Sequence, residues 1–429
     1  MRSLRLPCIF LAAFSLVLAA PEPQRLTLEQ ALQAAEQTSL EVLIGREAVA
    51  QAVEAAVRER SGLLPQVTLD ATQRRNRTAP GSGGINSRFD AQLTGRLDLL
   101  DPARIATYKA ATYAVAVARL GQEQLREVVT ATVAETYFAQ LRNLRRIEVL
   151  DANIARARSL VDLAHNQLNA GVATQIDVTR AEAQLAIDDQ ARLQQDTVVQ
   201  EGELRLKQLL GLDLARPLEL ADTRLQRIPP AADHAAYEEK AFAARSDLLA
   251  ARKLLDQNEL EVRAARYGRL PALSALGSYG YTSRNAFDGD EDRVWSGSLE
   301  VSMPVFDSAR TTSLTNLALS RRRAQELRVQ DLQTRIAAEV RLARQNAASR
   351  LAQIAVAEKG YALAGEELQL AERRFQQGVA DNRELVEAQN RLAAASDNRV
   401  EAAYNYQLSR IELHRVLGRV VGVLAEREE

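Results

Sequence analysis

The sequence LAHNQLNAGVA at residues 163–173 returns as LAERRFQQGVA at residues 370–380, 207 residues further along the chain. Two other segments repeat at almost the same distance: Leu64-Pro65 returns as Leu270-Pro271, and LDPAR at residues 100–104 returns as FDSAR at residues 306–310. Self-similarity at a fixed spacing indicates a repeated structural unit. The sequence therefore predicts one unit of about 206 residues that occurs twice.

Each unit contains a long stretch without proline. None of the 11 prolines lies between Ala103 and Arg216 or between Val305 and Glu429. Along the first stretch, apolar residues recur with a mean spacing of about 3.5, the period of helices that pack as coiled coils. We expect long helices at residues 103–168, 174–211, 308–376 and 381–418. The two longest would span about 100 Å at 1.5 Å per residue.

Ahead of each long helical stretch the apolar pattern changes to alternation. Leu93, Leu97 and Leu99 alternate with polar residues in the first unit, and Trp295 and Leu299 do so in the second. A period of two is typical of strands with one apolar and one polar face. We expect strands at about 64–75, 88–100, 271–283 and 293–305. The predicted fold class is mainly α, with a duplicated unit of two strands and two helices.

The first 20 residues differ from the rest of the chain. Arginines at positions 2 and 5 precede an apolar run at residues 6–18 and two alanines. This order predicts a secretory signal peptide at residues 1–20. The sole cysteine, Cys8, lies inside this segment. We therefore expect an exported chain that has neither a disulfide nor a lipid anchor.

The charges of the chain are nearly balanced, with 55 Lys and Arg against 56 Asp and Glu. Since no polybasic block occurs, the sequence argues against nucleic-acid binding. After the signal peptide, the longest uncharged stretch is residues 270–283, too short for a transmembrane helix. A membrane contact through the strands requires several copies of the chain, because the smallest membrane barrels have about eight strands. A soluble sandwich, or hairpins packed on helices, is the alternative.

Several features together resemble the TolC family of outer-membrane efflux and secretion channels. These are the duplicated unit, the Leu-Pro before each first strand, the Asp-x-Ala-Arg start of each long helix and the Gly-Val-Ala turns. The resemblance implies a homotrimer in the outer membrane of a Gram-negative bacterium. In it, a β-barrel of about 12 strands, four from each of three copies, is continuous with a periplasmic α-helical barrel. The implied partners are a periplasmic adaptor (membrane fusion) protein, outer-membrane lipid and an inner-membrane pump or ABC exporter. The implied role is the exit duct of a tripartite efflux pump or a type I secretion system.

The resemblance also assigns roles along the chain. Residues 21–211 and 247–429 become the two repeats, and residues 212–246 become a connector that joins an equatorial belt. The two turns become the adaptor-docking tips, formed by Gly171, Val172, Ala173, Gly378, Val379 and Ala380. The alternative is that both glycines have only a structural role, because glycine commonly ends a helix with a positive φ.

Acidic residues follow each turn, and the resemblance places Asp177, Glu384 and Glu387 at a periplasmic constriction. Glu384 and Glu387 are three residues apart and so lie on one helical face. The alternative is a solvated face of a charge-rich helix. Phe375 stands where the family has a tyrosine, and Ala380 stands where it has a basic residue. We therefore do not expect the family's latch bonds, and Arg383 is the candidate for a different one.

No other motif in the sequence points to chemistry. The three histidines, at positions 165, 234 and 414, are scattered and have no cysteine near them. We therefore expect no metal site, no cofactor and no catalytic site. A periplasmic coiled-coil adaptor or structural scaffold is the alternative function, and an enzyme is the least favoured class. The sequence does not specify the cargo.

Overall fold

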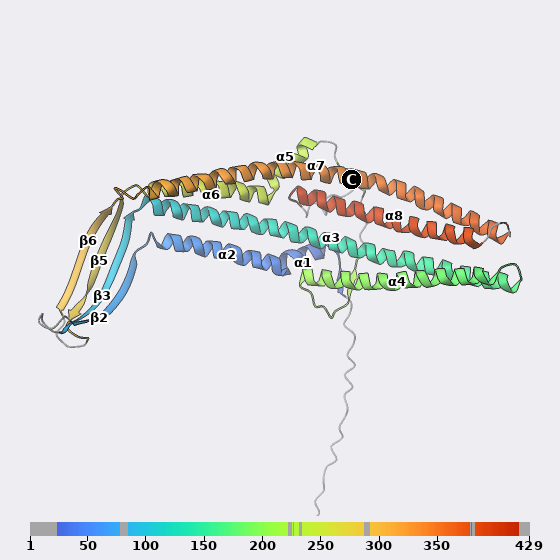
Figure 1. Cartoon of the computed structure of the whole chain (residues 1–429), viewed down its shortest axis with the longest axis horizontal. Helices are drawn as coiled ribbons and strands as arrows, with labels where there is room; N and C mark the ends of the chain where they lie inside the picture. Colours follow the sequence, from blue (N-terminus) through green and yellow to red (C-terminus); the bar gives the residue numbers. More distant parts are fainter. Residues whose placement is uncertain are drawn as a thin grey trace, which may run out of the picture.

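The computed structural model describes residues 24–77, 85–221, 225, 227–230, 234–286, 292–377, 379 and 382–419. The expected signal peptide at residues 1–20 lies outside this range. The described chain is elongated, with a curved four-stranded sheet at one end and long helices that run side by side away from it (Figure 1).

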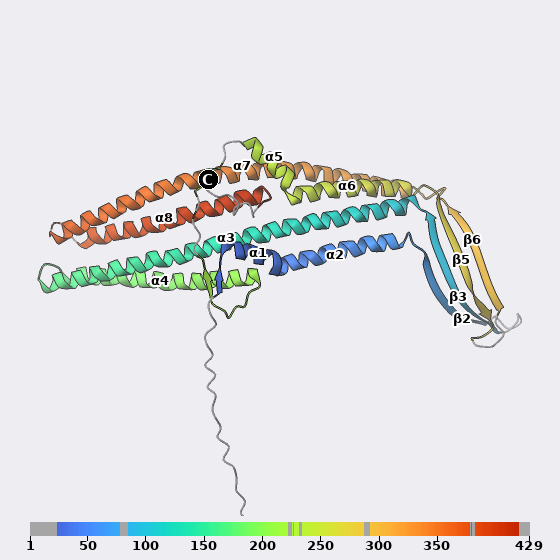
Figure 2. The ribbon, with the colours of Figure 1, turned by 180° about the vertical axis from the view of Figure 1, so that it is seen from behind.

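Two helices run the whole length of the helical part: α3 (Pro102–Asn169) and α7 (Arg310–Gln376). Two shorter helices lie along each of them, one beside each half of its length (Figure 2). The halves nearer the sheet are covered by α2 (Leu40–Ser61) and α6 (Ser246–Tyr267), and the far halves by α4 (Gln175–Leu210) and α8 (Asn382–Val416). With 68 residues, α3 is about 100 Å long. The chain thus turns back twice, at the end far from the sheet.

The two long helices begin differently. The Asp101 carboxylate accepts the N–H of Arg104 at 3.0 Å, and Pro102 follows at a position where a helix needs no N–H. In the second unit α7 begins at Arg310, later than the expected 308. The reason is that Ser308 and Ala309 have φ values of 49° and 66°, in the left-handed region. Asp307 still accepts the N–H of Thr311, at 2.8 Å.

A belt of short elements surrounds the middle of the helices. It contains the parallel pair β1 (Gln24–Leu26) and β4 (Leu218–Leu220), and the helices α1 (Leu28–Thr38) and α5 (His234–Ala244). The buried hydroxyl of Tyr137 on α3 lies 3.0 Å from the Leu26 carbonyl and 2.8 Å from the Ala221 carbonyl. This tyrosine therefore ties the belt of the first unit to the long helix.

The helices pack through small apolar residues, and glutamines bridge them. Gln140 and Gln195 are buried between α3 and α4 and donate to the carbonyls of Val199 (2.8 Å) and Asn143 (3.1 Å). Gln325 of α7 likewise donates to the Ala251 carbonyl of α6, at 3.0 Å. These hydrogen bonds fix how far one helix is shifted along its neighbour as well as the distance between the two helices. Within the described residues, no helix is both long enough and apolar enough to cross a bilayer.

The sheet has the antiparallel order β2 (Gln66–Arg77), β3 (Ile85–Leu100), β5 (Ala272–Ser283) and β6 (Asp292–Ser302). Its register aligns large apolar residues of neighbouring strands in one row: Leu69, Leu93, Tyr279 and Trp295. Trp295 is 80% exposed, and polar residues such as Thr94 and Ser278 alternate with this row on the other face. One face of the sheet is therefore apolar and open, and the other is polar.

Gly280 lies opposite Gln92 where the two units meet in the sheet. A Cβ at this position would lie 2.2 Å from the Ala91 carbonyl and 2.7 Å from the Cα of Gln92. Both atoms belong to the backbone of β3, which moves only if the strands separate. Gly297 has nothing within 4 Å of its Cβ position.

We expect Gly280→Ala to lower the stability of the folded sheet by about 1–3 kcal/mol, the usual cost of overpacking. Gly297→Ala is the matched control and should leave it almost unchanged. Unfolding in guanidinium, followed by tryptophan fluorescence of Trp295, measures both variants. Equal midpoints for the two variants would contradict this account of Gly280.

Candidate functional site

The candidate site is the far end of the helical hairpins, where the chain turns twice. At the first turn Gly171 has φ 74°, and the N–H of Val172 donates to the Gln167 carbonyl, which closes the end of α3. Val172 is 75% exposed at this turn, and Val379 is 66% exposed at the second. Of the residues predicted for docking, Gly378 and Ala380 lie outside the described part of the chain.

The two hairpins share one apolar core just above the turns. Leu160 and Val178 of the first unit pack there with Phe375 and Leu385 of the second. Phe375 is 7% exposed. Its ring is therefore part of the core, and it fixes the two hairpins against each other at the end of the molecule.

Asp177 has a local structural partner. Its carboxylate accepts the hydroxyl of Thr174 at 2.6 Å and the N–H of Thr174 at 3.0 Å, and Arg180 lies 3.8 Å away. Hydrogen bonds from the Thr174 hydroxyl, and then from its N–H, hold the pKa of Asp177 below its ordinary value of 3.8. The carboxylate therefore holds the first turn of α4 together at the start of the helix.

Glu384 and Glu387 belong to a network of arginines. The guanidinium of Arg374 on α7 reaches both oxygens of Glu384, at 2.9 Å and 3.4 Å. Glu387 lies 2.9 Å from Arg383 and 3.5 Å from Arg391, and Arg391 also pairs with Glu367 on α7. Each glutamate thus has at least one guanidinium of the same chain beside it.

The acidic positions of the two units correspond in sequence but not in role. Asp177 and Glu384 are 207 residues apart, yet Asp177 binds its own helix and Glu384 binds the preceding one. Sequence reasoning missed Arg374, Arg391 and Thr174. Only Thr174 had a local signal, a capping residue three positions before an acid. Arg383, the candidate for a different latch, pairs with Glu387 on its own helix.

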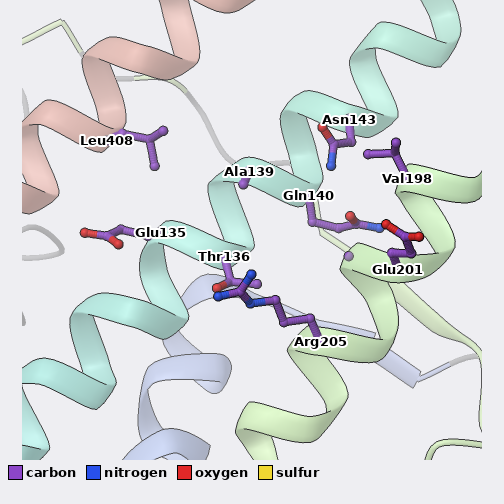
Figure 3. Close-up of a pocket in the computed structure, with 10 residues that line it drawn as sticks. Glu135, Thr136, Ala139, Gln140, Asn143, Val198, Glu201, Arg205 and Leu408 are labelled. Carbon is purple, nitrogen blue, oxygen red and sulfur yellow. The ribbon is translucent and has the colours of Figure 1, made fainter. Parts of the chain in front are cut away.

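A hollow of about 440 Å³ lies higher up, beside α3, between α4 and α8 (Figure 3). Glu135 points toward α8, and the guanidinium of Arg205 lies next to Thr136. Burial, and next the charge of Glu412, raise the pKa of Glu135. Gln140 inserts at Gly202, where a Cβ would lie 2.0 Å from its Oε1. The absence of a side chain at Gly202 therefore leaves room for Gln140 between α3 and α4.

Among the described residues, no group of three or more histidine, cysteine, aspartate or glutamate side chains is placed to hold a metal ion. The polar groups at the far end instead pair with one another or cap helices. The far end of the molecule thus carries a cluster of paired charges and two exposed valines.

The fold is that of outer-membrane channels. The crystal structure of the Campylobacter jejuni CmeC outer membrane channel matches it with a TM-score of 0.80 at 18% identity, over 91% of this chain and 85% of that one. The profile of the outer membrane efflux protein family matches residues 27–212 and 239–419. The chain belongs to this family of outer-membrane channel proteins, and the resemblance to the TolC family is confirmed.

Two characterised relatives are similar over most of the chain. Outer membrane protein TolC of Vibrio cholerae is 26% identical over 381 residues, which is 86% of this chain and 85% of the relative. The antibiotic efflux pump outer membrane protein ArpC of Pseudomonas putida is 25% identical over 389 residues, 84% of this chain and 76% of that protein. The similarity therefore extends across both units.

The cap at Asp177 predicts a pH dependence of the first turn. A carboxylate whose pKa is lower in the folded protein stabilises it above its ordinary pKa of 3.8, and this contribution disappears as the pH falls through the lowered value. Asp177→Ala should cost about 0.5–2 kcal/mol in the local stability of the start of α4 at pH 7. The same substitution should change this local stability little at a pH below the pKa that Asp177 has in the folded protein.

Hydrogen exchange of residues 174–180, compared between Asp177→Ala and the parent at matched pH, measures this difference. Asp162→Ala, an acidic position within the body of α3, serves as the control. A difference between parent and Asp177→Ala that is the same at pH 3 and pH 7 would be inconsistent with the titration.

Proposed function

We propose that the protein is the outer-membrane exit duct of a tripartite efflux pump or of a type I secretion system. In this proposal three copies form a 12-stranded β-barrel, four strands from each copy, that continues into an α-helical tunnel across the periplasm. The observation that carries it is the joining of a sheet with one open apolar face to helices about 100 Å long. Family membership supports the same function.

The far turns are proposed to meet a periplasmic adaptor, which in turn joins an inner-membrane pump or ABC exporter. Val172 and Val379 support this role because large apolar side chains so exposed at a turn favour contact with another protein. The docking set includes Gly171 and Ala173, with Gly378 and Ala380 by analogy between the units. Residues 21–211 and 247–429 act as the repeats, and residues 212–246 belong to the equatorial belt.

Asp177, Glu384 and Glu387 are proposed to surround the periplasmic mouth. The arginine partners modify what this ring does, because each glutamate has a guanidinium within 3.5 Å. We therefore expect a constriction lined by ion pairs. Its net charge depends on the arginines as much as on the carboxylates.

The purified protein in detergent is expected to have the mass of a trimer and to open ion-conducting pores in planar bilayers. Mass photometry and single-channel recording test these two statements together. A coiled-coil scaffold would also associate, but it would not conduct. A protein that is stably monomeric at micromolar concentration, or that never conducts, would overturn the proposal.

The charge network at the mouth predicts an effect on ion selectivity. Arg374→Gln removes the positive charge that pairs with Glu384, and the preference of the pore for cations over anions should increase. The control is Arg373→Gln, which removes the same charge one residue away, where the guanidinium donates to the Gln369 carbonyl of its own helix. Reversal potentials in a salt gradient measure the preference. Equal shifts in both variants would mean that Glu384 does not face the ion path.

A further inference from the structure

The chain passes between the helices and the sheet at two equivalent junctions (Figure 1). The first junction comprises residues 57–64 and 98–104, and the second comprises residues 263–270 and 304–310, 206 residues later. The first contains three arginines and three acidic residues, whereas the second contains four arginines and one acidic residue. The two units therefore differ in charge at the same place, and the second junction has an excess of positive charge.

At the first junction the central arginine is neutralised. The guanidinium of Arg104 lies 3.1 Å from the Asp98 carboxylate and 3.6 Å from that of Asp101, and it donates to the Gly62 carbonyl at 2.8 Å. The Asp98 side chain is only 8% exposed. Arg104 is therefore a structural residue, which joins the end of α2 to β3 and to the start of α3.

The equivalent arginine of the second junction lacks these partners. Arg310 occupies the position of Arg104, but a proline, Pro304, replaces the buried acidic partner of the first unit. The remaining acid, Asp307, accepts the N–H of Thr311 at 2.8 Å. Arg310 is exposed, and its side chain makes no hydrogen bond or ion pair with the part of the chain that the structure describes. Its positive charge is therefore available to a partner outside the chain.

A second change at this junction adds a positive charge. Arg269 occupies the position of Leu63 in the first unit. Its guanidinium donates to the hydroxyl of Thr312 at 2.6 Å, so the loop before β5 lies against the first turn of α7. Arg266, at the end of α6, is exposed and has no hydrogen-bonding or charged partner for its side chain among the described residues. We call Arg266, Arg269 and Arg310 the basic cluster.

Large apolar side chains adjoin the basic cluster along the chain and are open to solvent. Val305 is 90% exposed, Phe306 is 88% exposed, Leu270 is 45% exposed and Tyr267 is 39% exposed. A surface that serves only water-soluble anions has no need of such side chains. Cations beside exposed apolar and aromatic residues are instead typical of proteins at the boundary between lipid tails and headgroups.

The length of the apolar face of the sheet places this boundary at the basic cluster. The interval from Leu270, just before β5, to Tyr281, near its end, is eleven residues. Eleven extended residues span about 36 Å, and a strand tilt of about 35–45° reduces this to a height of about 26–30 Å. The apolar band of outer-membrane barrels has nearly this height, about 25 Å. In a bilayer, Arg269 would therefore lie at the level of the lipid phosphates on the side of the helices.

We propose that the basic cluster binds the phosphate groups of anionic phospholipids in the leaflet that faces the helices. Arginine suits this ligand because its planar group of donors binds two phosphate oxygens at once. Tyr267 and Phe306 contact the lipid next to its headgroup. This inference rests on the proposed function, in which the sheet lies in a bilayer. It adds the class of lipid and the side of the bilayer on which that lipid binds.

Two tryptophan positions provide the test. Trp295 is the single tryptophan of the chain and lies on β6, toward the end of the sheet that is away from the helices. The second reporter is Tyr267→Trp in a Trp295→Phe background, which places the fluorophore beside the basic cluster. Each protein is reconstituted into vesicles of phosphatidylcholine and phosphatidylglycerol in which one of the two lipids has brominated acyl chains. Because bromine quenches only a tryptophan that it contacts, the two mixtures give the ratio of the two lipids' binding constants at each position.

At position 267 phosphatidylglycerol should bind more strongly than phosphatidylcholine. Changing the basic cluster to glutamine should reduce this preference about fivefold or more, since one basic residue near an anionic bilayer surface accounts for about that factor. Changing it to lysine should keep most of the preference, because the charge remains, and high salt should weaken it. The ratio at position 295 should be the same in all of these proteins. The glutamine variant combines Arg266→Gln, Arg269→Gln and Arg310→Gln.

The matched control removes three other arginines that are exposed and have no side-chain partner among the described residues. Each lies about 20 Å or more along its helix from the nearer junction. The control combines Arg46→Gln, Arg119→Gln and Arg252→Gln. It should leave the ratio at position 267 unchanged. An equal reduction in this control would mean that the total charge of the protein attracts the lipid, and it would overturn the inference.

The remaining outcomes separate this inference from the proposed function. Absence of quenching at both positions would mean that the sheet does not lie in the bilayer, and it would overturn both. Quenching at position 295 but not at 267, or a ratio at 267 that the glutamine variant leaves unchanged, would overturn the inference alone. A preference that disappears when inorganic phosphate replaces chloride at the same ionic strength would identify a site for soluble phosphate and overturn the assignment to lipid.

Discussion

The backbone of every strand needs hydrogen-bonding partners, and this requirement determines the architecture of the molecule. Each hairpin alone has two open edges, and joining the two units closes one pair of edges through β3 and β5. The remaining pair, on β2 and β6, cannot close within the chain because the four strands are too few to curl into a barrel. Met303, Val305 and Phe306, which follow β6, are exposed beside this open edge. The long helices continue from these strands, so the arrangement of the sheet also sets how the helices stand beside one another.

Much of this architecture can be read from the sequence because its signals are periodic and long. Two stretches without proline, an apolar spacing of about 3.5 and short alternating runs indicate the helices and strands. Local backbone conformation is harder to read. Ala309 has positive φ without being glycine or asparagine, so nothing in its sequence announces the late start of α7. The buried glutamines are equally hidden, since Gln140 and Gln325 are of a type that usually faces water. Their role depends on a carbonyl of another helix.

At the far end of the helices, too, the sequence predicts where a side chain lies on its helix but not which residue it contacts. Sequence spacing places Glu384 and Glu387 on one face of a helix, which is a local property. It does not reveal that Arg374 lies across the turn, because that depends on how two helices pair after the chain reverses. Asp177 is the reverse case, since its partner Thr174 is three residues away and the capping pattern is visible in the sequence. Whether these carboxylates surround an opening depends on neighbouring copies, which a single sequence specifies only through its exposed surfaces.

The two hairpins have the same register, with Gln66 opposite Arg96 in the first and Ala272 opposite Ser302, 206 residues later, in the second. This agreement bears on the ancestry of the chain. A half-length protein with one hairpin and one pair of helices would already contain every strand contact needed to form a closed ring from identical pieces. Fusion of two such genes would preserve those contacts and halve the number of pieces. It would also allow the halves to diverge, because a change in one unit is no longer repeated in the next. The left-handed start of α7, absent from α3, and the different partners of Asp177 and Glu384 are differences that such a fusion permits.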